Sequence, residues 1–252
     1  MVGKKGLGLL AIAALMVFSL GSVAHADSIT VNVSGAGIGS NPLAAQAIFD
    51  ITGGVLTITL TNTSTAFTEI PAELLTGLYF DISSGAVLTP ISAILASGSI
   101  ILFGTTPSDG VVGGEFGFRD DITSGFHGAQ YGISNSGMDD VFGPTDLFPG
   151  PDLDPPDSPD GPNLGMVSAG GIGPSANSKV SGDVPLIFNS VVFTFDITGA
   201  LALSDFSNFS FQYGTSQDEP NLPIPEPATM TLLGIGLVGL EARRRRRASS
   251  QA

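Results

Sequence analysis

Short apolar segments that alternate with polar residues recur along this chain, and no useful length of it has the period of an amphipathic helix. The clearest examples are AQAIFDI and VLTITLTNTS, which lie on either side of Gly53-Gly54. Two alternating runs around a Gly-Gly pair predict a β-hairpin. The pattern therefore restricts the body of the chain to a sheet-based fold.

Further strand-like segments follow the same rule and are bounded by Gly, Ser or Pro. They are SITVNVSG, LLTGLYFDIS, AVLTPISAIL and GSIILFG, and SVVFTFDITG and FSNFSFQYG are expected to form a second pair joined by residues 200–205. Strands at this spacing without intervening helices predict an all-β fold, a single β-sandwich or jelly-roll-like domain over residues 27–223.

The middle of the body differs in composition. Pro, Gly and Asp dominate residues 143–174, where we expect little regular structure. We interpret this stretch as a long loop inserted between two halves of the β-domain, and loops of this length are usually functional or disordered.

The N-terminus has the three parts of a secretory signal. Lys4 and Lys5 form its positive region, residues 7–20 are apolar, and Ala24 and Ala26 frame a small-x-small cleavage site. Residues 1–26 therefore predict a signal peptide, export by the Sec machinery and a mature chain that starts at Asp27. The chain has no cysteine, so its stability outside the cell must come from core packing or bound ions.

The C-terminus combines a Pro225-Glu226-Pro227 motif, an apolar run over residues 228–240 and an arginine cluster. The cluster consists of Arg243, Arg244, Arg245, Arg246 and Arg247. As a helix, the 13-residue run spans about 20 Å, short of the roughly 30 Å of a hydrocarbon core. The arginines should stay cytoplasmic, so we expect a short, transient anchor in the inner membrane.

Residues 224–252 resemble the PEP-CTERM sorting signal in the order and spacing of all three parts. The resemblance implies recognition by an exosortase, a membrane transpeptidase or protease of Gram-negative bacteria that make extracellular polysaccharide. It further implies cleavage near Pro225 and a place at the cell surface or outside the cell. A plain C-terminal membrane anchor is the alternative. The segments AIFDITGGVLTITLTNTS, LLTGLYFDIS and FSFQYGTSQDEP also resemble PEP-CTERM surface proteins in their general cadence.

Charge excludes one class of partner. Between Asp27 and Glu219 the chain has 21 acidic side chains against only Arg119 and Lys179. Nucleic-acid binding requires clustered Lys and Arg, so we expect no nucleic-acid partner. An acidic body instead favours solubility and attraction to cations.

Acidic residues concentrate in and before the predicted loop, and they are the candidates for a metal site. They are Asp139, Asp140, Asp152, Asp154, Asp157 and Asp160. Calcium takes six to eight oxygen ligands, several of them carboxylates, so calcium is the candidate cofactor here. Known calcium-loop patterns fail, and a solvated acidic loop without any cofactor is the simpler interpretation.

The sequence offers few combinations of residues that could support catalysis. His127 is the only histidine of the predicted mature body, there is no cysteine nucleophile, and the G-x-S-x-G motif is absent. A pair of carboxylates drawn from Asp120, Asp121, Asp139 and Asp140 could hydrolyse a glycosidic bond. The aromatic residues Phe116, Phe118, Phe126 and Tyr131 could stack on sugar rings, although burial in a core is the commoner use.

Together these patterns predict a non-enzymatic, exported structural protein of the cell surface or of an exopolysaccharide or biofilm matrix. Its expected partners are the Sec machinery, an exosortase and extracellular polysaccharide. A calcium- or carbohydrate-binding adhesin is the alternative, and a secreted glycoside hydrolase is a weaker one.

Overall fold

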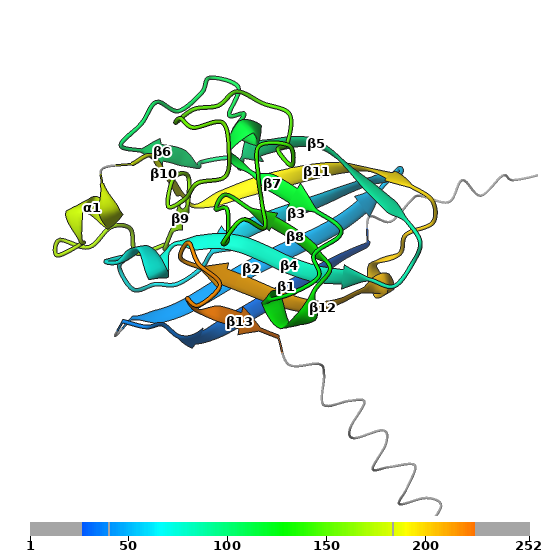
Figure 1. Cartoon of the computed structure of the whole chain (residues 1–252), viewed down its shortest axis with the longest axis horizontal. Helices are drawn as coiled ribbons and strands as arrows, with labels where there is room; N and C mark the ends of the chain where they lie inside the picture. The colour runs from blue at the N-terminus through cyan, green and yellow to red at the C-terminus, as the bar shows by residue number, and fades with distance from the viewer. Residues whose placement is uncertain (1–26, 40, 183, 225–252) are drawn as a thin grey trace, which may run out of the picture.

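The computed structural model describes residues 27–39, 41–182 and 184–224, and in this part of the chain two β-sheets pack face to face. Figure 1 shows the sheet that contains β4 and β12 lying in front of β2 and β3 of the other sheet. The all-β prediction is confirmed. The apolar helix predicted over residues 228–240 lies outside the described residues.

The first sheet has five antiparallel strands in the order β1-β2-β3-β11-β5. Their bounds are Asp27–Ala36 (β1), Pro42–Thr52 (β2), Val55–Asn62 (β3), Ser190–Thr198 (β11) and Val87–Leu95 (β5).

The second sheet follows the order β13-β12-β4-β9-β10-β6, with β8 also paired to β4 and β7 paired to β8. Its strands are Asn221–Pro223 (β13), Phe206–Tyr213 (β12), Leu75–Ile82 (β4), Met166–Val167 (β9), Leu186–Phe188 (β10), Ile100–Leu102 (β6), Gly117–Arg119 (β7) and Tyr131–Ser134 (β8). Short helical turns connect the strands at Pro71–Glu73 (η1), Gly113–Glu115 (η2), Phe126–Gly128 (η3), Ser178–Ser181 (α1) and Leu203–Asp205 (η4).

The β2–β3 hairpin forms where the alternating pattern predicts it. Buried and half-buried residues alternate along both strands, so one face of the sheet enters the core. Gly53 and Gly54 make the turn with φ of 62° and 84°, a conformation that favours glycine.

The predicted second pair is wrong. The segments around Val191 and Phe211 are strands, β11 and β12, but they lie in opposite sheets. β11 pairs with β3 and β5, whereas β12 pairs with β4 and β13. Residues 199–205 therefore cross from one sheet to the other instead of closing a hairpin.

Aromatic side chains fill the space between the sheets. Phe49 of β2 contacts Phe80 of β4 and Phe206 of β12, with ring centroids 5.6 Å and 5.0 Å apart. Phe193 of β11 contacts Phe116 at 5.1 Å. Residues that are distant in the sequence thus share one apolar core.

The long irregular segment lies between β8 and β9, from residue 135 to residue 165. It starts earlier than the predicted loop of residues 143–174, and β9 lies inside the predicted range. It is also part of the packed structure, because Phe148 is 1% exposed and contacts both Phe193 and Phe195 of β11.

The turn η2 fastens this segment to the domain. Gly113 and Gly114 leave room for the backbone of the segment, since a Cβ at either would collide with the carbonyl oxygen of Pro149 or Pro151. The next residue, Glu115, is 3% exposed, and its carboxylate accepts hydrogen bonds from the backbone N–H groups of Leu153 and Asp154. A buried carboxylate therefore binds the backbone of the irregular segment.

Burial raises the pKa of Glu115 to about 7 from its ordinary value of 4.5. The two backbone N–H groups oppose this rise, and the negative charge of Asp152 adds to it. The anchor of the segment is therefore a carboxyl group that titrates near neutral pH.

Core burial predicts a large difference between two phenylalanines. Phe49 is fully buried between the sheets, whereas Phe67 is 51% exposed. We expect Phe49→Ala to lower the free energy of unfolding by about 3–5 kcal/mol and Phe67→Ala to change it by less than about 0.5 kcal/mol. Urea unfolding of the exported chain measures both, and equal effects would contradict the described core.

The anchor at Glu115 predicts a pH-dependent stability. Between about pH 4.5 and pH 7 this carboxyl keeps its proton in the folded state but has released it in the unfolded chain. The protonated carboxyl therefore contributes fully to the free energy of unfolding below pH 4.5, and this contribution is lost as the pH rises to 7. We expect the wild-type free energy of unfolding to fall by up to about 3 kcal/mol over this range relative to Glu115→Gln, which keeps a side-chain acceptor but does not titrate.

Asp152→Asn is the matched variant for this measurement. It removes the charge that adds to the pKa of Glu115, so the decline should end at a lower pH than in the wild type. Identical pH profiles for the wild type and Glu115→Gln in denaturant titrations would rule out this role of Glu115.

Candidate functional site

The predicted export and sorting residues lie outside the described residues. These are Ala24, Ala26, Pro225, Glu226, Pro227, Arg243, Arg244, Arg245, Arg246 and Arg247. The structure does describe where the chain approaches the Pro-Glu-Pro motif. Pro223 ends β13 opposite Ser210 of β12, and the N–H of Ile224 donates to the carbonyl of Phe209 at 2.9 Å. The motif therefore follows a hydrogen-bonded edge of the second sheet with no linker between them.

Three of the six candidate calcium ligands accept hydrogen bonds from the loops themselves. The carboxylate of Asp139 accepts the backbone N–H of Gln217 at 3.1 Å, and that of Asp152 accepts the N–H of Asp154 at 3.2 Å. Asp160 accepts from the amide of Asn163 at 3.1 Å. Asp152 and Asp160 thus close local turns, whereas Asp139 joins two segments that are distant in the sequence.

Asp152, Asp154 and Asp160 lie close enough for their charges to interact. Burial raises the pKa of Asp160, and the charges of Asp154 and Asp152 raise it further. Asp140 and Asp157 are exposed. Within the described ranges no group of three or more Asp, Glu or His side chains converges closely enough to hold a metal ion. The structure therefore does not bring the six aspartates together as one metal site.

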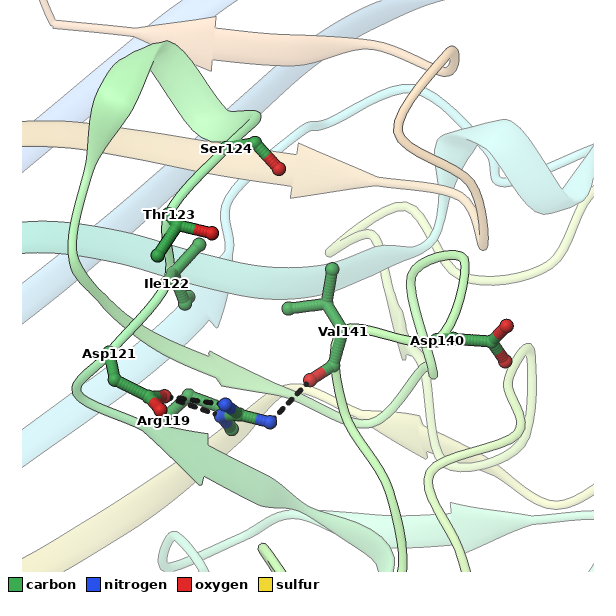
Figure 2. Close-up of a pocket in the computed structure, with 7 residues that line it drawn as sticks. All are labelled: Arg119, Asp121, Ile122, Thr123, Ser124, Asp140 and Val141. Atoms are coloured by element: carbon green, nitrogen blue, oxygen red, sulfur yellow. Dashed lines mark hydrogen bonds and ion pairs between the residues drawn. The ribbon is translucent and has the colours of Figure 1, made fainter.

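A shallow depression of about 210 Å³ lies beside Arg119, at the end of β7. Its lining consists of Arg119, Asp121, Ile122, Thr123, Ser124, Asp140 and Val141. Figure 2 shows the residues 121–124 on one side of the depression and Val141 and Asp140 on the other. Two of the four aspartates proposed for glycoside hydrolysis, Asp121 and Asp140, therefore share one surface feature.

Arg119 organises one wall of this depression. Its guanidinium donates to the carboxylate of Asp121 at 2.7 Å and to the carbonyl oxygen of Val141 at 3.2 Å (Figure 2). A longer ion pair of 3.7 Å joins it to Asp146. The hydrogen bond that Arg119 donates to Asp121 is the main cause that raises the pKa of Arg119. A single cation thus ties β7 to two loops.

A small second core supports the depression. Tyr79 of β4 stacks on Phe126 with ring centroids 3.7 Å apart, and Met138 and Phe142 pack against the same cluster as Ile122. Burial raises the pKa of Tyr79 well above its ordinary value. Ile122 and Val141, which line the depression together with polar residues, therefore belong to or pack against this apolar cluster.

The other sequence candidates have ordinary structural positions. Phe116, Phe118 and Phe126 are buried and Tyr131 is half-buried, so their assignment to the core is confirmed. His127 is exposed in η3 with φ of 57°, and its carbonyl oxygen accepts from Asn208 at 3.3 Å. Three of the four aromatic side chains are therefore enclosed in the protein, and the fourth, Tyr131, is partly accessible.

Sequence reasoning missed Arg119 and Tyr79. The scarcity of basic residues could have drawn attention to Arg119, because it and Lys179 are the only Lys or Arg residues between Asp27 and Glu219. Tyr79 gave no separate signal, because its segment looks like any other apolar strand. Its contact with Phe126, 47 positions later, depends on the tertiary fold.

Among the described residues, no helix has the length and apolar character needed to span a bilayer. Comparison with curated proteins and with solved structures gave no match. The model of one family, described as the PEP-CTERM protein-sorting motif, matches residues 223–247. The motif implies recognition by an exosortase and a secreted or surface-exposed protein. The chain therefore carries a PEP-CTERM sorting motif, whose first matched residue, Pro223, is also the last residue of β13.

Proposed function

We propose that this protein is a non-enzymatic structural component of the cell surface or of an exopolysaccharide or biofilm matrix in a Gram-negative bacterium. In this proposal the Sec machinery exports the precursor and the apolar run over residues 228–240 holds it transiently in the inner membrane. An exosortase then cuts near Pro225. The observation that carries the proposal is the sorting motif at residues 223–247, which directly follows a folded domain.

Two features of the domain support a structural role. Two of the four aspartates considered for glycoside hydrolysis take part in hydrogen bonds that hold the fold: Asp139 accepts from the N–H of residue 217, and Asp121 accepts from Arg119. The irregular segment of residues 135–165 is packed into the core through Phe148 and anchored through Glu115. Both features stabilise a domain that must last outside the cell without disulfides.

A carbohydrate-binding adhesin is the second candidate, and the depression beside Arg119 favours it. Its polar rim of Asp121, Thr123 and Asp140 above apolar Ile122 and Val141 has the composition of a small polar-ligand site. Binding of neutral oligosaccharides that is lost in Thr123→Val would support this alternative. Calcium-dependent thermal stabilisation that EDTA reverses would support a calcium-binding adhesin.

The proposal is tested by the terminal masses of the native protein, recovered from the medium and the cell surface of its own host. We expect a product that starts at Asp27 and ends near Pro225. An intact tail ending in Ala252, found only in the inner membrane, would show that the motif is not processed and would overturn the proposal.

Glu226 lies at the centre of the Pro-Glu-Pro motif, and we expect Glu226→Ala to block processing. The variant should accumulate as a membrane-bound precursor that retains residues up to Ala252. Asp218→Ala is the matched control, because it removes a nearby exposed carboxylate outside the matched residues 223–247 and should leave processing unchanged. Normal release of the Glu226→Ala variant, measured by mass spectrometry of the medium, would contradict this role.

A further inference from the structure

The strand β1 forms an unusually open border of the first sheet. It pairs with β2 over ten residues, from Asp27 opposite Ile51 to Ala36 opposite Pro42, and the register is unbroken. Among the described residues β1 makes no backbone hydrogen bond to any strand other than β2. Within the described part of the chain, its other side therefore presents a row of unpaired N–H and C=O groups, which can pair with another strand.

The opposite border, β5, is protected from such pairing. Pro90 lacks an N–H, and a register shift opposite Thr194 and Phe195 bulges the strand at this point. Residues 110–112 also cover its end, since Leu95 donates to Gly110 at 2.8 Å and Val112 donates to Ala93 at 2.9 Å. None of these devices is present on β1.

The borders of the second sheet are too short to compete. The strands β13, β6 and β7 have three residues each, β13 ends in Pro223, and residues 146–148 bond to the free side of β7. Leu222 of β13 lies against Gly35 of β1. Gly35 shares the face of β1 that carries the buried Val31, so Leu222 packs from the core side and leaves the hydrogen-bonding edge open.

The distribution of charge also favours β1 as the edge for pairing. From Ser28 to Ala36 there is no charged residue, in a body that has 21 acidic side chains. Two copies of an acidic protein repel each other over most of their surface. At β1 they can approach without placing carboxylates of the two strands opposite each other.

We propose that β1 is a self-association edge, which pairs antiparallel with β1 of a second copy. A twofold axis at Val31 would place Ile29 opposite Val33 of the second copy and Thr30 opposite its Asn32. Apolar residues then continue the core face and polar residues continue the solvent face. Two five-stranded sheets become one continuous sheet, and Ile29 and Val33, only half-buried in one copy, gain cover.

This inference goes beyond the proposed function and does not depend on sorting. It concerns the strand Asp27–Ala36, which lies outside the segment that the proposed cleavage near Pro225 would remove. The masses of the two chain ends test whether the precursor is cleaved, whereas the mass of the protein in solution tests whether two copies pair. Failure of one proposal is therefore distinguishable from failure of the other.

Sedimentation equilibrium of the exported chain, produced from the full-length precursor, measures the association. We expect a concentration-dependent species of twice the monomer mass. In the variant Thr30→Lys with Asn32→Lys, each lysine faces a lysine of the second copy, and we expect the dissociation constant to rise at least about tenfold. In Thr30→Lys with Asn32→Asp, each lysine faces an aspartate, and dimerisation should persist.

Thr89→Lys on the protected strand β5 is the matched control, because Thr89 is also an exposed threonine on a border strand. It should leave the dissociation constant unchanged. Both residues changed on β1 are exposed, so the variants should fold, which circular dichroism verifies. None of the variants alters residues 228–240, so association through that apolar run would affect all of them equally.

A wild-type chain that stays monomeric at all concentrations would overturn the proposal. A dimer that is insensitive to the two lysines would show that β1 is not the interface and would also overturn it. Dimerisation that is equally weak in the Lys/Asp and Lys/Lys variants would exclude the twofold register centred on Val31.

Discussion

Burial of apolar side chains between two sheets is the interaction on which this structure depends, because a chain without cysteine has no covalent cross-link to replace it. The core takes Phe49 from the first sheet, Phe80 from the second and Phe148 from the irregular segment between β8 and β9. Segments far apart in the chain are thus held together by the same apolar core between the two sheets. The depression lies beside Arg119 at the end of β7, and the described chain ends at Ile224 after β13. This apolar core positions both strands.

The shortage of cations decides how the acidic groups are satisfied. With two basic residues for 21 acidic ones, ion pairs can neutralise few carboxylates. Backbone N–H groups take their place: Glu73 accepts from residue 69 at 2.7 Å, Glu219 from residue 216 at 3.1 Å, and Asp146 from residue 143 at 2.8 Å. Hydrogen bonds to charged groups are stronger than neutral ones, so the abundant carboxylates also hold loops in place.

Local patterns predicted much of the fold and little of the site. The β2–β3 hairpin was predictable because alternation and a Gly-Gly turn are both local, and the sorting motif was predictable because its three parts are contiguous in sequence. The placement of β11 and β12 in opposite sheets was not, since the choice depends on which distant strand each one meets. Arg119 joins Asp121, Val141 and Asp146 only after β7 and two loops have come together, so no spacing in the sequence indicates it.

The position of the sorting motif also limits what processing can change. All residues of the three apolar clusters that are buried lie between Val31 and Tyr213, upstream of the matched residues 223–247. A cut near Pro225 therefore removes no buried side chain of the described core, and β13 keeps its pairing with β12 through residue 223. The tail that the proposed cut would remove supplies none of the described strands, so the cleaved product keeps every residue of both sheets, including those of β1.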